Sequence, residues 1–590
     1  MISIHNLSFT YPGSLSPQLN HINLTIEKGE FIALIGENGC GKSTLCKAIN
    51  GLIPHFFSGD YEGSVVVDSL CVEKVSISQL PQKVGYVYQD FENQIIRPTL
   101  IDDASFASMN YAYPDYIERG RQSLIKVGLG HRQQDYIWQL SGGQKHLLAL
   151  ASASALNPEI YVLDEPIAQL DPQHANDIYR LLEKLNQEEG KTVIVIEHHT
   201  EYIAQYCTHV VMMHEGRVVW KLPTKEALNR IEELQSKSIF PPQVTLAVKR
   251  YAEQNENLLP VTFEEGLIFF EKHLGDAVKN KRSHTPNMHK PSLHTQSEHN
   301  PSLHTPSRHI MSDIRSNKEK IVSLKNISLE YATVKGPKTK IFDELNIDLY
   351  KGENIGVIGN NGAGKTTLFK LLTGLIRASK GSIFVAGEET TRMSPEKIAN
   401  HISMVYQNPE QMFISDSIEG DIMYTMKARK VEDYEKRGIE LMEQFRLLDI
   451  RERDGRLLSG GQMRRASLAI GIALNPSILL LDEPTANLDI ATRKEILRML
   501  TSMQGRVNTA IIASHDMQLI SEWADRILVL HHGKIIADGC REEIFGNHEL
   551  MRLAGIDAPP IHRLSQHFDH ESSCFTLDEF DDYFRLEGVV

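Results

Sequence analysis

The chain has 590 residues, a formal net charge of −14 and six scattered cysteines without C-x-x-C spacing. Its length suits two domains with extensions rather than one core, and its acidic balance argues against nucleic acid as the main ligand. The cysteine pattern argues against disulfides and zinc sites. No run of about 18 apolar residues and no leader-like start are present, so we expect a cytoplasmic protein without a membrane span.

A glycine-rich loop follows the first buried apolar run, Phe31–Gly36. The loop reads GENGCGKST and fits the pattern G-x-x-x-x-G-K-S/T. In such a loop backbone amides surround phosphate oxygens, the lysine reaches the β- and γ-phosphates, and the hydroxyl after it supplies an oxygen to Mg²⁺. The following helix points its positive end at the anion. The candidate nucleotide-binding residues are Gly36, Glu37, Asn38, Gly39, Cys40, Gly41, Lys42, Ser43 and Thr44.

The same motif returns after the apolar run Ile355–Ile358, where the sequence reads GNNGAGKTT. Self-similarity over this distance predicts two copies of one nucleotide-binding domain. The second set of candidates is Gly359, Asn360, Asn361, Gly362, Ala363, Gly364, Lys365, Thr366 and Thr367.

A tyrosine precedes each loop, Tyr11 in the turn YPG and Tyr331 at the matching place in the second copy. Either ring could stack on an adenine, because aromatic faces accept any base. The alternative is that both are ordinary turn tyrosines.

A glutamine ends the next apolar run in each copy. Gln89 closes VGYVYQ, and Gln407 closes ISMVYQ. A neutral amide at a strand end can bind Mg²⁺ or orient an attacking water without adding charge. The recurrence at matching places favours such a role over chance.

The pentapeptide LSGGQ then appears in both copies. A serine hydroxyl and bare glycine amides at the start of a helix form an anion site, which could hold a γ-phosphate from the far side. The alternative is a simple helix N-cap. The candidate residues are Ser141, Gly142, Gly143, Gln144, Ser459, Gly460, Gly461 and Gln462.

Paired carboxylates end the buried runs IYVLDE and ILLLDE. The aspartates, Asp164 and Asp482, suit Mg²⁺ coordination, and the glutamates, Glu165 and Glu483, suit polarising the attacking water as a general base. Further along in each copy come an aspartate and then a strand-end histidine that can bond a γ-phosphate. These later residues are Asp171, Asp489, His198 and His515.

This ordered motif set resembles that of ATP-binding cassette ATPases, and LSGGQ is specific to that family. The resemblance covers both halves. It implies an α/β fold of two tandem P-loop NTPase domains, each with a helical subdomain and a small C-terminal extension, that hydrolyse ATP with Mg²⁺. Each ATP would lie between one domain's phosphate loop and the other's LSGGQ, so the domains pair within the chain. The implied catalytic residues are Glu165, Glu483, His198, His515, Gln89 and Gln407, and the implied metal ligands are Ser43, Gln89, Asp164, Thr366, Gln407 and Asp482.

The first copy departs from this pattern at two places. KHLLALA follows its LSGGQ where the second copy has MRRASLA and the family usually carries an arginine, and Ile167 stands where the second copy has Thr485. Both glutamates are present, so we expect roughly similar activity at the two sites.

One further stretch resembles energy-coupling-factor transporter ATPases, which power uptake of vitamins and of cobalt or nickel. Gln407–Tyr424 begins QNPEQMF and Gln89–Phe106 begins QDFENQI, both similar to the Q-N-P-E-x-Q-hydrophobic stretch of that family. Phe91 departs from it by replacing the proline. In that family this segment meets the coupling helix of a membrane subunit; a shared surface loop is the alternative.

Each copy also ends in a similar extension. PPQVTLAV and PVTFEEGLIFF, which start at Pro241 and Pro260, resemble APPIHRLSQHF and CFTLDEFDDYF, which start at Ala558 and Cys574. Small helical tails of this type help to pair the domains of energy-coupling-factor ATPases. We therefore predict a first domain over residues 1–275, a linker over 276–317 and a second domain over 318–590.

The predicted linker carries a histidine at every fifth residue from His284 to His309. Proline, serine and threonine are abundant there, so it should be flexible. Two interpretations stay open: a tether that binds Ni²⁺, Co²⁺ or Zn²⁺, or a tandemly duplicated linker without a ligand.

The resemblance implies that the chain drives import of a vitamin or transition metal ion from the cytoplasmic face of the cell membrane. Its partners would be an integral membrane coupling subunit and a small substrate-binding membrane subunit. The main alternative is a soluble twin-cassette translation factor, which would carry a long, charged helical linker. A sugar-importer ATPase would lack the tails, and a DNA-repair cassette protein would need zinc cysteines or a coiled coil.

Overall fold

The structure is a computed structural model that describes residues 1–168, 170–251, 258–282, 318–331, 339–486, 488, 490–502, 509–569 and 572–584. The histidine repeat, Asp489 and the side chain of Tyr331 lie outside this description. The expectations attached to them stay predictions.

An antiparallel sheet opens the first domain. Its strands lie in the order β2-β1-β4-β5. Buried and exposed residues alternate along much of β1, as expected for a strand with one face on a core. The bounds are β1 Ile2–Thr10, β2 Leu19–Ile26, β4 Asp60–Val67 and β5 Leu70–Cys71.

A second, mainly parallel sheet has the order β10-β9-β3-β8-β7-β6, with β10 antiparallel at its edge. Every residue of β3, β7 and β8 is buried, which explains their unbroken apolar runs. The carboxyl ends of parallel strands meet at one edge, so the motifs that follow them gather there. The bounds are β3 Phe31–Ile35, β6 Val84–Val87, β7 Ile160–Asp164, β8 Thr192–Ile196, β9 His209–His214 and β10 Arg217–Pro223.

Helices cover both faces of the parallel sheet. Helix α1, Lys42–Ile49, lies between the two sheets and shares one core with both. On the opposite face α6, α7, α8 and α9 close a second core. Their bounds are α6 Pro172–Gln187, α7 Thr200–Tyr206, α8 Thr224–Leu228 and α9 Ile231–Ser236, and the short α2 spans Leu52–His55.

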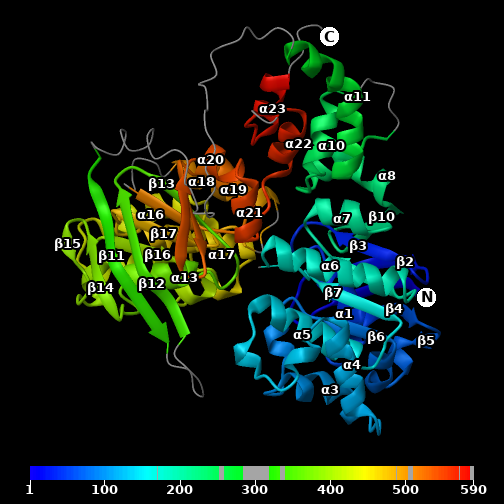
Figure 1. Cartoon of the computed structure of the whole chain (residues 1–590). Coiled ribbons are helices and arrows are strands. Elements are labelled where there is room, and N and C mark those ends of the chain that lie inside the picture. Colours follow the sequence, from blue (N-terminus) through cyan, green and yellow to red (C-terminus); the bar gives the residue numbers. More distant parts are fainter. Residues whose placement is uncertain are drawn as a thin grey trace.

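Three helices form a subdomain with its own core beside the sheet (Figure 1). They are α3 Leu100–Asn110, α4 Tyr116–Lys126 and α5 Gly142–Ser154. The expected helical subdomain is therefore present in the first domain, and α5 starts directly after Ser141.

The second domain repeats this plan, with sheets β12-β11-β14-β15 and β16-β17-β18-β13-β19-β20. Its strands are β11 Lys320–Tyr331, β12 Thr339–Tyr350, β13 Asn354–Ile358, β14 Lys380–Val385, β15 Glu388–Glu389, β16 Ile402–Val405, β17 Ile478–Asp482, β18 Thr509–Ala513, β19 Arg526–His531 and β20 Lys534–Gly539. Its helices are α13 Lys365–Leu372, α14 Pro395–Ile398, α15 Ile418–Ala428, α16 Tyr434–Gln444, α17 Gly460–Ile472, α18 Ile490–Ser502, α19 Met517–Trp523, α20 Arg541–Phe545 and α21 His548–Ala554.

The two C-terminal extensions pack against each other. In Figure 1 the green α10 and α11 of the first copy lie beside the red α22 and α23 of the second, and side chains from both copies form one buried cluster. The bounds are α10 Gln243–Lys249, α11 Phe263–Arg282, α22 Pro560–Phe568 and α23 Leu577–Phe584. Helix α11 includes residues 276–282, so the first extension continues into the predicted linker.

Among the described residues, every helix is too short or too polar to cross a membrane. All six cysteines are described, and each is a free thiol.

Candidate functional site

The first phosphate loop closes around the side chain of Lys42, the first residue of α1. Its buried ammonium group donates hydrogen bonds to the carbonyl oxygens of Gly36, at 2.8 Å, and Glu37, at 3.0 Å. Gly36 has a φ of 150°, and a Cβ there would come within 2.3 Å of the carbonyl oxygen of Met213. Only glycine fits this position. The loop geometry therefore supports the predicted phosphate site.

The second loop has the same geometry. The ammonium of Lys365 donates to the carbonyl oxygens of Gly359, at 2.7 Å, and Asn360, at 3.3 Å. Gly359 has a φ of 151°, and an added Cβ would lie 2.1 Å from the carbonyl oxygen of Leu530. Both predicted loops thus fold alike, each at the start of a helix whose positive end faces the loop.

A hydroxyl and a buried carboxylate meet beside each lysine. Ser43 lies beside Asp164, and Thr366 lies beside Asp482, where each hydroxyl favours the charged form of the carboxylate. Each aspartate keeps one buried oxygen, Oδ1, without a hydrogen-bond partner among the described residues. Burial raises the pKa of Asp164, and it raises the pKa of Asp482 to about 6. A hydroxyl with a spare carboxylate oxygen fits Mg²⁺, which prefers oxygen ligands.

Three predicted catalytic residues converge in the first domain. The amide Nε2 of Gln89 donates to Oε2 of Glu165 at 2.8 Å, and Nε2 of His198 lies 3.4 Å from the other carboxylate oxygen. Glu165 has a φ of 50°, a left-handed conformation that is strained for a residue with a side chain. Strain of this kind is concentrated at functional sites, where surrounding contacts hold it in place.

The second domain holds its glutamate more tightly. Glu483 is also left-handed, with a φ of 46°, but it is buried, and Ser514 donates to its Oε2 at 3.1 Å. Nδ1 of His515 lies 2.9 Å from Oε1. Burial by itself would raise the pKa of Glu483, but the neighbouring charge of His515 leaves that pKa below its usual range. Burial by itself would lower the pKa of His515. The negative charge of Glu483 outweighs burial, so the pKa of His515 is raised.

Gln407 is positioned through its backbone. Its carbonyl oxygen accepts a hydrogen bond from the guanidinium of Arg464 at 2.7 Å. Arg464 extends from α17, the helix that follows the second LSGGQ. This link joins the glutamine loop to the helix of the predicted anion site.

Both LSGGQ serines cap their own helices. The hydroxyl of Ser141 accepts from the amide of Gln144 at 3.3 Å, and the Gln144 side chain accepts from the amide of Ser141 at 3.1 Å. Ser459 and Gln462 form the same reciprocal box. Both serines therefore act as helix N-caps, as the alternative interpretation expected. The anion role of these helix starts stays a prediction.

One motif of the first domain touches a phosphate loop of the second. Oδ2 of Asp171 accepts a hydrogen bond from the backbone amide of Asn361 at 3.2 Å. The ammonium of Lys494 also lies 3.8 Å from the ring centre of Phe240, across the same pair of domains. The two domains are therefore in contact near one predicted site, while the expected ATP sandwich stays a prediction.

Tyr11 lies close to the first phosphate loop. Its hydroxyl is 3.5 Å from that of Thr44, and its ring packs edge-on against Phe9 at 4.8 Å. These contacts fix the ring beside α1. Adenine stacking remains a prediction for Tyr11.

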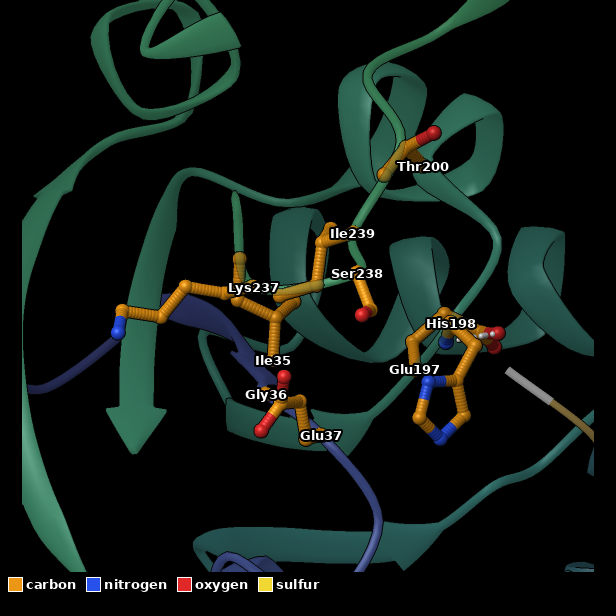
Figure 2. Close-up of a pocket in the computed structure, with 9 residues that line it drawn as sticks. All are labelled: Ile35, Gly36, Glu37, Glu197, His198, Thr200, Lys237, Ser238 and Ile239. Carbon is orange, nitrogen blue, oxygen red and sulfur yellow. Dashed lines mark hydrogen bonds between the residues drawn. The ribbon is translucent and has the colours of Figure 1, made fainter. Parts of the chain in front are cut away.

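Sequence reasoning missed a buried carboxylate directly before His198. Glu197 accepts from the amides of His198, at 2.7 Å, and His199, at 2.9 Å, and from the hydroxyl of Tyr179 at 2.9 Å. Burial raises the pKa of Glu197. Figure 2 shows Glu197 beside His198 in the lining of a pocket that also includes Glu37 of the phosphate loop. A charged residue at the end of the run VIVIE was the only available signal.

Comparisons with known proteins agree with this geometry. The family model described as ABC transporter matches residues 19–168 and 342–486. A Methanosarcina acetivorans protein named as an ABC transporter ATP-binding protein is 30% identical over 98% of this chain and 90% of its own. A Streptococcus mutans protein named in the same way is 31% identical over 98% of this chain and 97% of its own.

The solved structure of cbiO1 from Clostridium perfringens, described as part of the ABC transporter complex cbiONQ, is 28% identical. That structure covers 40% of this chain and 94% of its own, with a TM-score of 0.36. The family model, the paired motifs and the relatives that match almost the whole chain agree. This chain is an ATPase of the ABC transporter ATP-binding family, with two tandem cassette domains.

Proposed function

We propose that this chain is the ATP-hydrolysing subunit of an energy-coupling-factor type importer for a vitamin or a transition metal ion. The observation that carries the proposal is the shared core of the two C-terminal extensions. Phe270 of the first copy and Phe580 of the second are fully buried, with ring centres 5.3 Å apart. Paired tails of this type are the feature by which the sequence resembles energy-coupling-factor ATPases rather than sugar importers.

Exposed apolar side chains support a membrane partner. Ile96 is 64% exposed and Ile414 is 62% exposed, at matching places after the two strand-end glutamines. Trp138 and Leu457, just before the two LSGGQ motifs, are exposed as well. Apolar residues that gather near a functional loop fit a protein interface better than open solvent. We assign these surfaces to an integral membrane coupling subunit, which would hold the chain at the cytoplasmic face.

The proposed chemistry is in-line attack of water on the γ-phosphate, supported mainly by positioning and charge neutralisation. Glu165 and Glu483 would each polarise the attacking water, with Gln89 and Gln407 orienting it. Mg²⁺, when bound, would neutralise charge on the phosphates, and the hydroxyl and carboxylate pairs beside the two lysines would hold it. The helix starts at the LSGGQ motifs would close over the γ-phosphate from the opposite domain.

Affinity purification of the tagged chain from detergent-solubilised membranes tests the assignment. We expect a transmembrane coupling protein and a small substrate-binding membrane protein to copurify, and the ligand of the small protein names the cargo. A variant with Ile96→Asp and Ile414→Asp should lose both partners while it stays folded. Recovery of ribosomes without any membrane partner would contradict the proposal of an importer. The assignment of the chain as an ATPase would still hold.

A further inference from the structure

In the second domain, one buried arginine ties the glutamine loop to the LSGGQ helix. Arg464 is 2% exposed and donates to the carbonyl oxygens of Tyr406, at 2.9 Å, and Gln407, at 2.7 Å. Burial lowers the pKa of Arg464 to about 10, so the guanidinium stays charged at neutral pH. Two charge-assisted hydrogen bonds thus fix the backbone that carries Gln407.

The first domain has His146 at this position, five residues after the LSGGQ serine as in the second. His146 is 1% exposed, and neither ring nitrogen has a hydrogen-bond partner within the described chain. Burial lowers the pKa of His146 to about 4, so the ring is neutral. It stacks on Phe91, with ring centres 4.4 Å apart and planes 26° from parallel. Phe91 stands where the second domain has Pro409.

Two further contacts hold the glutamine loop of the first domain. Lys145 forms an ion pair with Glu92 at 2.7 Å, and the side chain of Gln94 bonds the backbone of Tyr86, at 3.1 Å, and Tyr88, at 3.2 Å. The second domain has methionines, Met463 and Met412, in place of Lys145 and Gln94. The two domains therefore fasten the same loop to the same helix by different side chains.

The stack lies close to the catalytic contact. Phe91 begins the short 3-10 helix η3, Phe91–Gln94, two residues after Gln89, whose amide bonds Glu165 at 2.8 Å. Burying an unpartnered imidazole is less favourable than burying an aliphatic side chain, because its nitrogens lose water without replacement. Space filling alone would therefore favour an aliphatic residue. Stacking on Phe91 requires a planar ring, which explains why a histidine stands here instead of an aliphatic residue.

We propose that Phe91 and His146 are a positioning pair that keeps Gln89 in contact with Glu165, in place of the arginine link of the second domain. The inference rests on the proposed roles of Gln89 and Glu165. Ring stacking is weaker and less directional than charge-assisted hydrogen bonds.

The test measures hydrolysis by the full chain in a Glu483→Gln background, where the first site supplies the activity. We expect His146→Ala to lower kcat by about tenfold, because small misplacements of catalytic groups have large effects on rate. KM for ATP and the affinity for a fluorescent ATP analogue should change less than about twofold, because the phosphate loop is untouched. Phe91→Ala, which changes a partly exposed residue, should give the same loss of kcat.

Two rescues separate positioning from general packing. His146→Phe keeps a flat ring over Phe91 and should restore most of kcat. The double change Phe91→Pro with His146→Arg transplants the link of the second domain and should also restore it. Leu148→Ala, on the same helix and equally buried, is the matched control. It should lower the melting temperature without the selective loss of kcat.

An unchanged kcat in His146→Ala would overturn the positioning pair, as would a loss of kcat equal to that of Leu148→Ala. The double variant Glu165→Gln with Glu483→Gln checks the site assignment separately. If it keeps the hydrolysis rate of the Glu483→Gln background, the proposed catalytic glutamate of the first site is wrong, and the role of the pair falls with it.

Discussion

At the scale of single residues, the two glutamates share a strained backbone but differ in surroundings. Glu165 contacts Gln89 and His198, while Glu483 is buried against His515 and Ser514. We expect Glu165→Gln and Glu483→Gln each to keep part of the wild-type ATPase rate, since each leaves one general base intact. The double variant should fall by at least about 100-fold. Steady-state phosphate release measures this, and one glutamine variant with full activity beside an inactive other would contradict it.

The His515–Glu483 pair predicts a pH effect on stability. The folded-state pKa of His515 is raised above 6.5, so its contribution is complete below that pH and is lost as pH rises through the raised value. The folded-state pKa of Glu483 is lowered below 4.5, so its contribution is complete above that pH and is lost as pH falls through the lowered value. The pair therefore stabilises the fold most between these limits.

Thermal unfolding at about pH 6 and about pH 8 measures this contribution. His515→Gln should lower the melting temperature more at the lower pH than at the higher, because the contribution of the charged imidazole decreases as pH rises above 6.5 towards its raised pKa. Glu483→Gln should remove the same pH dependence, because the partner charge is gone. An equal loss at both pH values in both variants would show that the pair does not carry charge.

At the scale of elements, the segments that follow the two glutamines form the proposed docking surface. Ile96 and Ile414 are exposed, so replacing either by aspartate should leave the melting temperature and the basal ATPase rate of the free chain unchanged. The same changes should weaken binding to the membrane subunit by about tenfold or more, since a buried charge without a partner is costly. Binding in detergent measures this. Ile268→Asp, equally exposed but on α11, is the control that should not weaken it.

The sequence predicted the elements that carry the site better than the contacts within it. The apolar run Phe31–Gly36 predicted β3, and the recurring motifs predicted the second domain, because buried parallel strands and phosphate loops leave strong local patterns. Glu197 was missed because its partner Tyr179 lies on α6, which the sequence pattern does not place beside the end of β8. The departure at KHLLALA was visible, but the stack of His146 on Phe91 depends on burial and distance, which periodicity does not report.

At the scale of the whole molecule, side chains from the two domains contact each other directly. The extensions share one buried cluster, and Asp171 of the first domain reaches the phosphate loop of the second. Arg250 adds ion pairs to Asp578 and Asp581 across the extensions. The pair with Asp578 is exposed, and exposed ion pairs contribute little to stability. The apolar cluster therefore supplies most of the attraction between the extensions.

This cluster predicts coupling between two residues in different domains. Phe270→Ala and Phe580→Ala should each destabilise the extensions by about 3–5 kcal/mol, because each ring is fully buried. The double variant should be less destabilised than the sum, because the rings contact each other edge to face. Chemical unfolding measures the coupling, and small-angle scattering should show a larger radius of gyration once the extensions separate. Phe445→Ala, fully buried within the second domain, should lower stability without expanding the chain. Strictly additive losses with unchanged scattering would show that the shared cluster does not hold the domains together.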